Sequence, residues 1–241
     1  MPDDVLERYR KAGSATVYIA VYRQPVERGE WFATVTWQRC LMKGVRQMRP
    51  GHTLVGRART LRFVPPRPDL LEITRQGERS PEYLAMGACG PGDVLVVEAH
   101  SQEEQASILG NMKTRQLWHN GAEGVVTDGA IRDLDMIVND YDLGVFAGQR
   151  SPAGNLPWIE AYEAHEAVNC GGILVLPGDV IVADDDGAVV VPCQLAERVI
   201  DWIEEQDAAE QYVIGLIDEE KCPPGRYYPI SEEIKNQARG D

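Results

Sequence analysis

The chain has 241 residues, 44% of them hydrophobic, so it can bury a sizeable core and fits one domain over residues 1–241. Its 24 Lys and Arg stand against 38 Asp and Glu, and the net charge of -14 would repel a nucleic-acid backbone and an anionic membrane. Nucleic acid and membrane are therefore excluded as expected partners. The N-terminal segment lacks an apolar signal region, and the five cysteines are widely spaced, which predicts a reduced, cytoplasmic protein.

The N-terminal third predicts two short helices followed by a strand. The segments "DDVLERYRKAG" and "SATVYIAVYRQ" have helical character, and Ser14 is available as the N-cap of the second. The segment "HTLVGRARTLRFV" alternates in polarity as a strand does, and "PPRP" after it marks a loop.

The middle of the chain alternates apolar runs with helical segments. The runs "DVLVVEA", "EGVVTDG" and "LGVFAG" are typical of buried strands, and a helix is predicted between each pair. The first helix is expected over residues 103–119, with Ile108, Met112 and Leu117 on one face, and the second begins near Asp133. This order predicts parallel strands joined by crossovers.

The segment "GGILVLPGDVIVADDDGAVVVP" has a different character, because it contains three strand-like pieces separated by "PGD" and "DDDG". Both separators are typical of hairpin turns, so this part is expected to be antiparallel. Asp184, Asp185 and Asp186 are interpreted as a solvated turn rather than a metal site. A long amphipathic helix, "CQLAERVIDWIEEQDAAEQYVIGLIDEE", and a tail containing Pro and Tyr end the chain.

The stretch "VVTDGAIRDLD" carries the main candidate site. Ligands gather at the carboxyl ends of strands in α/β sheets, and Arg132 and Asp133 follow such an end. Taken alone, such a pair is more often a carboxylate at a helix start beside a surface arginine. In "LGNMKTR", Gly110 permits close approach of a ligand, and the amides of Asn111 and Met112 could bind a carboxylate, although ordinary helix initiation explains them too.

Three segments in the same order resemble one family. They are "PGDVLVVEA", "LGNMKTRQLWHNGAEGVVTDGAIRDLDMI" and "GGILVLPGDVIVADDDGAVVVP". The resemblance is to the family that joins regulator of ribonuclease activity A to the 4-hydroxy-4-methyl-2-oxoglutarate/4-carboxy-4-hydroxy-2-oxoadipate aldolases, and it covers about residues 50–215. It implies an α/β fold, a β/β/α swivelling-type domain with a mixed sheet, assembled as a homotrimer or homohexamer with its active site at a subunit interface.

The resemblance also implies a chemistry. The aldolase members use Mg²⁺ or Mn²⁺ to cleave 4-hydroxy-2-oxo acids to pyruvate. Carried over, Arg132 would hold the pyruvyl carboxylate or keto oxygen, Asp133 would bind the metal directly or through water, and Gly110, Asn111 and Met112 would complete the substrate pocket. In the aldolases an aspartate often stands at the position of Asn111, whose amide oxygen can still accept from a metal-bound water.

Two functions of different classes follow. The first is a metal-dependent lyase of a small 2-oxo acid, acting by retro-aldol cleavage, by decarboxylation of oxaloacetate, or by both, because the two reactions pass through the same pyruvate enolate. The second is a noncatalytic regulator that binds a ribonuclease, for which an acidic surface would suit a basic partner. Asp133 favours the enzyme, since a binding module has no need of a metal-site carboxylate beside the arginine.

Overall fold

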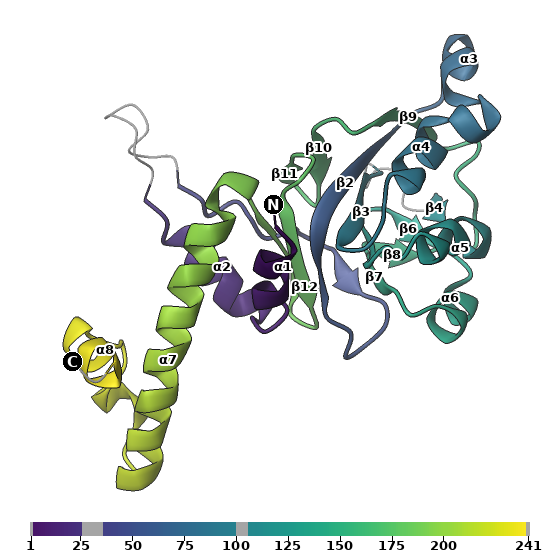
Figure 1. Cartoon of the computed structure of the whole chain (residues 1–241). Helices are drawn as coiled ribbons and strands as arrows, with labels where there is room; N and C mark the ends of the chain where they lie inside the picture. The colour runs from purple at the N-terminus through teal and green to yellow at the C-terminus, as the bar shows by residue number, and fades with distance from the viewer. Residues whose placement is uncertain (1, 26–35, 100–105, 240–241) are drawn as a thin grey trace.

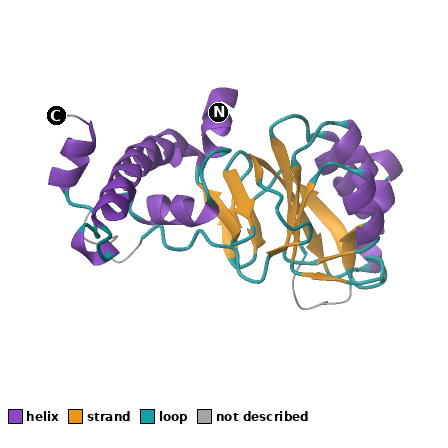
Figure 2. Ribbon diagram, turned by 90° about the horizontal axis from the view of Figure 1, so that it is seen from below, coloured by secondary structure: helices purple, strands orange, loops and turns teal. Residues whose placement is uncertain are grey.

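A mixed β-sheet lies between two groups of helices in this computed structural model, which describes residues 2–25, 36–99 and 106–239 (Figure 1). In the view from below, the strands occupy the middle and helices flank them on both sides (Figure 2). The strands of the sheet are β1 (Arg46–Gln47), β2 (Leu54–Val64), β3 (Asp93–Glu98), β5 (Gly124–Thr127), β7 (Gly144–Ala147), β9 (Glu160–Ala164), β12 (Val180–Asp184) and β13 (Gly187–Val191). Their order is β1-β7-β5-β3-β2-β12-β13, with β9 paired to β2.

The predicted parallel strands are confirmed. β2, β3, β5 and β7 pair in parallel, in the register Arg57 to Asp93, Val94 to Gly124 and Gly124 to Gly144. Every residue of β3, β5 and β7 is buried, because side chains that alternate along a strand enter a different hydrophobic cluster on each face. Such strands are continuously apolar, and this is why the sequence predicts them well.

Three of the four parallel strands are each followed in the chain by a strand of a second, smaller sheet. β4 (Ser107–Leu109), β6 (Ala130–Ile131) and β8 (Gln149–Arg150) pair in parallel, in the order β4-β6-β8. The strands follow β3, β5 and β7 in the chain, and two of them lead into the helices α5 (Asn111–His119) and α6 (Leu134–Asp140). The helix predicted over 103–119 therefore begins only at Asn111, and Ile108 lies in a strand. Residues 100–105 are outside the described residues.

The antiparallel part is confirmed in one hairpin and wrong in the other. β12 and β13 form the predicted hairpin across Asp184–Gly187. The expected hairpin at "PGD" does not form, because β11 (Ile173–Val175) pairs with β10 (Val168–Cys170) and β12 pairs with β2. The carboxylate of Asp179 instead accepts the N–H groups of Leu176 and Cys193 and so ties together the two ends of this region.

The two edges of the main sheet are joined by one segment. Met42 donates its backbone N–H to Ala188 of β13, and Val190 donates to Cys40. A few residues later, Arg46 and Gln47 form β1 and pair with β7 at the opposite edge. The mixed sheet is therefore nearly closed.

Helices cover the outside of this sheet on two sides (Figure 1). On one side lie α1 (Asp3–Tyr9), α2 (Ser14–Tyr22) and α7 (Ala196–Glu220), and on the other α4 (Pro81–Gly87), α5 and α6. The remaining α-helices of the described residues are α3 (Leu71–Thr74) and α8 (Glu232–Arg239), and α8 packs on α7, with Arg239 paired to Glu205. None of the helices in the described residues is both long and apolar enough to cross a membrane.

The two predicted N-terminal helices are confirmed, but the cap of the second differs. Ser14 is the first helical residue, with Gly13 at the N-cap position. The carboxylate of Asp184 accepts the Ser14 N–H at 2.7 Å and the Ser14 hydroxyl at 2.6 Å. Asp184 thus satisfies the helix start from 170 residues away. Its Oδ1 also accepts the Asp186 N–H at 3.0 Å within the turn that Asp185 and Asp186 form.

Candidate functional site

Arg132 and Asp133 lie where β6 ends and α6 begins. The Arg132 N–H donates to Leu109 O at 3.1 Å, so the small sheet holds the backbone immediately before Asp133. Asp133 is at the N-cap of α6 in the left-handed conformation, with φ 57° and ψ 31°. Its carboxylate lies 3.8 Å from Arg132 Nε, and both side chains are about half exposed. A non-glycine residue in this conformation costs about 1–3 kcal/mol and is often found at functional sites.

The start of α5 contacts this pair directly. The Asn111 N–H donates to Asp133 Oδ2 at 3.0 Å. A Cβ at Gly110 would lie 2.6 Å from the same oxygen and 2.9 Å from Arg132 Cγ and Nε. The predicted close approach at Gly110 is thus an approach of the protein's own Arg132 and Asp133.

The Asn111 side chain faces α6. Its Oδ1 accepts the hydroxyl hydrogen of Tyr141 at 2.7 Å, and the Tyr141 ring packs at a tilt on Trp118, 5.7 Å between centroids. The amide oxygen retains a second lone pair. Since the Asn111 N–H is engaged by Asp133, the free helix-start donors within the described part of the chain are the N–H groups of Met112 and Lys113.

A cavity of about 240 Å³ opens over these groups. It is lined by Gly110, Met112, Arg132 and Asp133, so the five residues proposed from the sequence converge, with Asn111 reached through its backbone. The Met112 side chain itself is 78% exposed. The helix start and the guanidinium together present positive charge to this cavity, which suits a small carboxylate.

The sequence did not indicate the other polar lining of the cavity. Lys113 donates through Nζ to Glu82 Oε2 at 2.6 Å and to Ile108 O at 3.2 Å. Tyr83 and Asn155 also line the cavity. No short-range motif links α4, α5 and the loop before β9, so only the folded chain brings these residues to Arg132.

Two carboxylates, the partly buried Asp128 and the buried Glu98, bind backbone groups near the ends of β3 and β5. Asp128 accepts the Ala99 N–H at 2.8 Å and the Gly171 N–H at 3.3 Å, while Glu98 accepts the Asn169 N–H at 2.8 Å. Burial raises the pKa of the Asp128 carboxyl, with a smaller contribution from the negative charge of Glu98. The ends of β3 and β5 are thereby fixed to the β10–β11 hairpin, and these two acids are structural.

The residues fit a magnesium-type ion better than a zinc-type one. Within residues 2–25, 36–99 and 106–239, no three His, Cys, Asp or Glu side chains gather around a common point. Asp133 Oδ2 is engaged by Asn111, and Oδ1 accepts no hydrogen bond from the described residues. One free carboxylate oxygen beside a polar cavity suits Mg²⁺ or Mn²⁺, since Mg²⁺ usually keeps several waters and takes one or two carboxylates.

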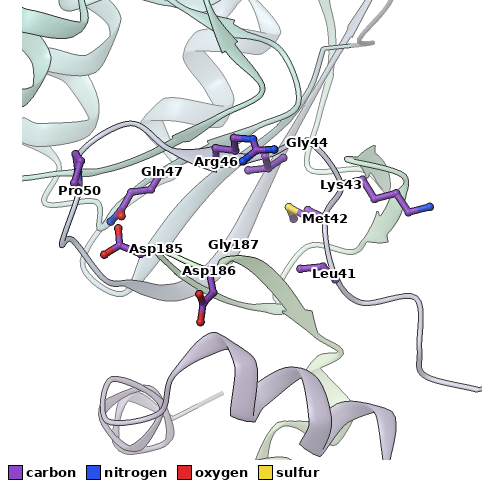
Figure 3. Close-up of a pocket in the computed structure, with 11 residues that line it drawn as sticks. Leu41, Met42, Lys43, Gly44, Arg46, Gln47, Pro50, Asp185, Asp186 and Gly187 are labelled. Atoms are coloured by element: carbon purple, nitrogen blue, oxygen red, sulfur yellow. The ribbon is translucent and has the colours of Figure 1, made fainter.

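A larger cavity, about 490 Å³, lies elsewhere, where the segment 41–47 meets the β12–β13 turn (Figure 3). Asp185 accepts the Gly51 N–H at 3.2 Å there, and Figure 3 shows Lys43 extending away from the other labelled side chains. Charges that diverge or bond to backbone do not converge on a ligand. We therefore assign this cavity to the closure of the sheet.

The fold and this arrangement define a class: a nearly closed, mixed α/β sheet with an Arg-Asp turn at the carboxyl end of its parallel strands. Residues 14–190 match the family model described as "RraA-like: Aldolase/RraA". The chain belongs to this RraA-like family.

Similar proteins carry two kinds of name. A Halalkalibacterium halodurans protein named "Putative 4-hydroxy-4-methyl-2-oxoglutarate aldolase" is 27% identical over 181 residues, 71% of this chain and 75% of that protein. A Pseudomonas aeruginosa protein of the same name is 37% identical over 103 residues, 43% of this chain and 62% of that protein. The structure of Streptomyces coelicolor RraAS2, called an unusual member of the RNase ES inhibitor RraA protein family, aligns with a TM-score of 0.74 and 28% identity over 88% of this chain and 96% of that one.

Proposed function

We propose that the protein is a divalent-metal-dependent lyase that releases pyruvate from a 4-hydroxy-2-oxo acid, from oxaloacetate, or from both. The observation that carries the proposal is the junction of Arg132, Asp133 and the Asn111 N–H at the rim of one cavity. The family and the aldolase names of its relatives agree with a carbon–carbon lyase.

In this proposal Arg132 and Asp133 have different roles. Arg132 binds the substrate carboxylate through its planar guanidinium, assisted by the N–H groups of Met112 and Lys113 at the start of α5. Asp133 would hold the cation, and the Asn111 N–H, which donates to Asp133 Oδ2, sets the orientation of the carboxylate. A bound Mg²⁺ or Mn²⁺ would supply Lewis acidity at the 2-oxo group, where negative charge develops when the C3–C4 bond breaks.

The test measures pyruvate release in an assay coupled to lactate dehydrogenase. The substrates are oxaloacetate and a series of 4-hydroxy-2-oxo acids, each after chelation and again with added Mg²⁺ or Mn²⁺. We expect turnover only with metal, and its loss in Asp133→Asn, because a neutral amide holds a hard dication poorly. Binding of Mn²⁺, measured by electron paramagnetic resonance, should weaken in the same variant, and Asp69→Asn, which changes an exposed carboxylate paired with Arg67, serves as the control.

The second candidate is the noncatalytic regulator. The likeness to RraAS2 and the charge of -14 favour it, since an acidic surface suits a basic protein. Absence of pyruvate from every substrate with either metal would turn the assignment to this regulator. In both cases we propose a homotrimer or homohexamer, which light scattering at micromolar concentration would contradict if it gave the mass of a monomer.

A further inference from the structure

A second cavity adjoins the one at Arg132. It has a volume of about 330 Å³, and the two cavities share Tyr83, Lys113 and Asn155 as lining residues. We call it the distal cavity; Arg75, Glu82 and Glu160 also line it. A ligand anchored by its carboxylate at Arg132 can therefore extend past Lys113 into the distal cavity.

The charges of the distal cavity are already compensated in pairs. Arg75 donates to Glu160 through Nε at 3.0 Å and through a terminal nitrogen at 3.2 Å, and the Arg75 guanidinium lowers the pKa of the Glu160 carboxyl. Lys113 and Glu82 form the second pair at 2.6 Å. The Glu160 side chain is 8% exposed, and those of Lys113 and Glu82 are 19% and 14% exposed, so both carboxylates belong to the wall.

The two ion pairs that line the distal cavity disfavour two kinds of substrate tail. A terminal carboxylate would meet two negative side chains, and the cations that could bind it are engaged. An alkyl tail would remove water from two ion pairs without replacing its hydrogen bonds. Hydroxyl groups satisfy both requirements, because each can donate to a carboxylate and accept from a guanidinium, an ammonium or an amide.

Two shared residues have capacity left for such a ligand. Within the described residues, the Tyr83 hydroxyl and the Asn155 side-chain amide make no hydrogen bond, and both residues line both cavities. Tyr83 is 37% exposed, and its ring adds an apolar surface for the C–H groups of the same tail.

Resting on the proposed lyase function, we propose that the substrate is a 4-hydroxy-2-oxo acid whose chain beyond C4 is hydroxylated, as in a deoxy sugar acid, and that the distal cavity binds this tail. The C3–C4 bond breaks, its electron pair forms the pyruvate enolate, and C3 then takes a proton to become the methyl group. The C4 hydroxyl loses its proton and C4 becomes an aldehyde carbon. The products are pyruvate and a hydroxylated aldehyde.

Three substrates of equal chain length test the proposal: one hydroxylated at C5 and C6, one without these hydroxyls, and one ending in a carboxylate. We expect the hydroxylated acid to have the highest kcat/KM, by about 100-fold or more, because a site that pairs with hydroxyl groups rejects analogues lacking them. Equal values for the first two, or preference for the carboxylate, would overturn the proposal while leaving the lyase in place. Pyruvate from none of the three would overturn the lyase itself.

Two variants test whether the distal cavity causes the preference for a hydroxylated substrate. Glu160→Gln keeps the side-chain shape, and Tyr83→Phe removes one oxygen from a partly exposed ring; each should reduce the ratio of kcat/KM between the hydroxylated and the deoxy acid by about tenfold. Asp69→Asn, which disrupts the exposed pair of Arg67 and Asp69, is the matched control and should leave the ratio unchanged. Thermal unfolding verifies that each variant is folded. An unchanged ratio in both cavity variants places the selectivity elsewhere and refutes the assignment.

Discussion

Replacing Gly110 by alanine should disable the site while leaving the fold intact. The new Cβ would lie 2.6 Å from Asp133 Oδ2, so this oxygen must move by about 0.9 Å to reach an ordinary separation of about 3.5 Å. Arg132 Cγ and Nε, at 2.9 Å, must move as well. The backbone itself tolerates alanine, since Gly110 is extended with φ -144°.

The magnitude follows from these displacements. A misplacement of about 1 Å costs about 100-fold in rate, or about 2.7 kcal/mol of transition-state stabilisation. Arg132 and Asp133 are about half exposed and can swing into solvent, so the free energy of unfolding should fall by only about 1 kcal/mol, a shift in Tm of about 2–4 °C.

Pyruvate release and thermal unfolding measure the two effects separately. Gly215→Ala is the matched control, because a Cβ there has nothing within 4 Å and the residue lies in the exposed part of α7. It should keep full activity and stabilise the protein by about 1 kcal/mol. If Gly110→Ala retains more than half of the wild-type kcat/KM while Gly215→Ala behaves as expected, the reaction does not take place at Arg132 and Asp133.

Three further predictions concern named side chains. Arg132→Lys should lower kcat/KM by about 100-fold or more with an unchanged Tm, because an ammonium cannot bind a carboxylate in two places; wild-type kinetics would remove Arg132 from the site. Asn111→Asp retains an acceptor for Tyr141 and adds a negative charge, so the half-saturating magnesium concentration should fall about 10- to 100-fold, and equal titration curves would show that Asn111 does not act on the metal. The pKa of Asp128 is raised in the folded protein, so the free energy of unfolding of the wild type, minus that of Asp128→Asn, should fall as the pH rises from 3.8 through that raised pKa. Urea unfolding measures both values, and a wild-type-minus-variant value that stays constant or rises would contradict a raised pKa at Asp128.

Prediction from sequence succeeds here where the physical cause is local. The central residues of β3, β5 and β7 form continuous apolar runs because both faces of these strands are buried, and such runs are visible in the sequence itself. The Arg132–Asp133 turn is likewise a contiguous motif. These local features include the parts of the fold that carry the proposed chemistry.

Prediction from sequence fails where a structure depends on contacts between residues far apart in the chain. The strands β4, β6 and β8 have two or three residues each and exist only through pairing with one another, so no periodicity marks them. The cap on α2 comes from Asp184, and the Lys113–Glu82 pair joins two helices 31 residues apart. Each depends on tertiary contact, and the distal cavity, which includes the Lys113–Glu82 pair, could not be predicted from the sequence.

The joining of β13 to β7 through residues 40–47 has a consequence for how the chain must fold. The contact between Leu41 and Val189 joins residues far apart in the chain. The chain must therefore lose the conformational entropy of closing this long loop before the hydrogen bonds of strand pairing can stabilise it. Until then, the edges of β7 and β13 present unpaired backbone groups that can template pairing with another chain. Refolding should accordingly be slow for a protein of this size and should lose yield to aggregation as concentration rises, whereas in the folded molecule β7 and β13 both pair with the segment 40–47.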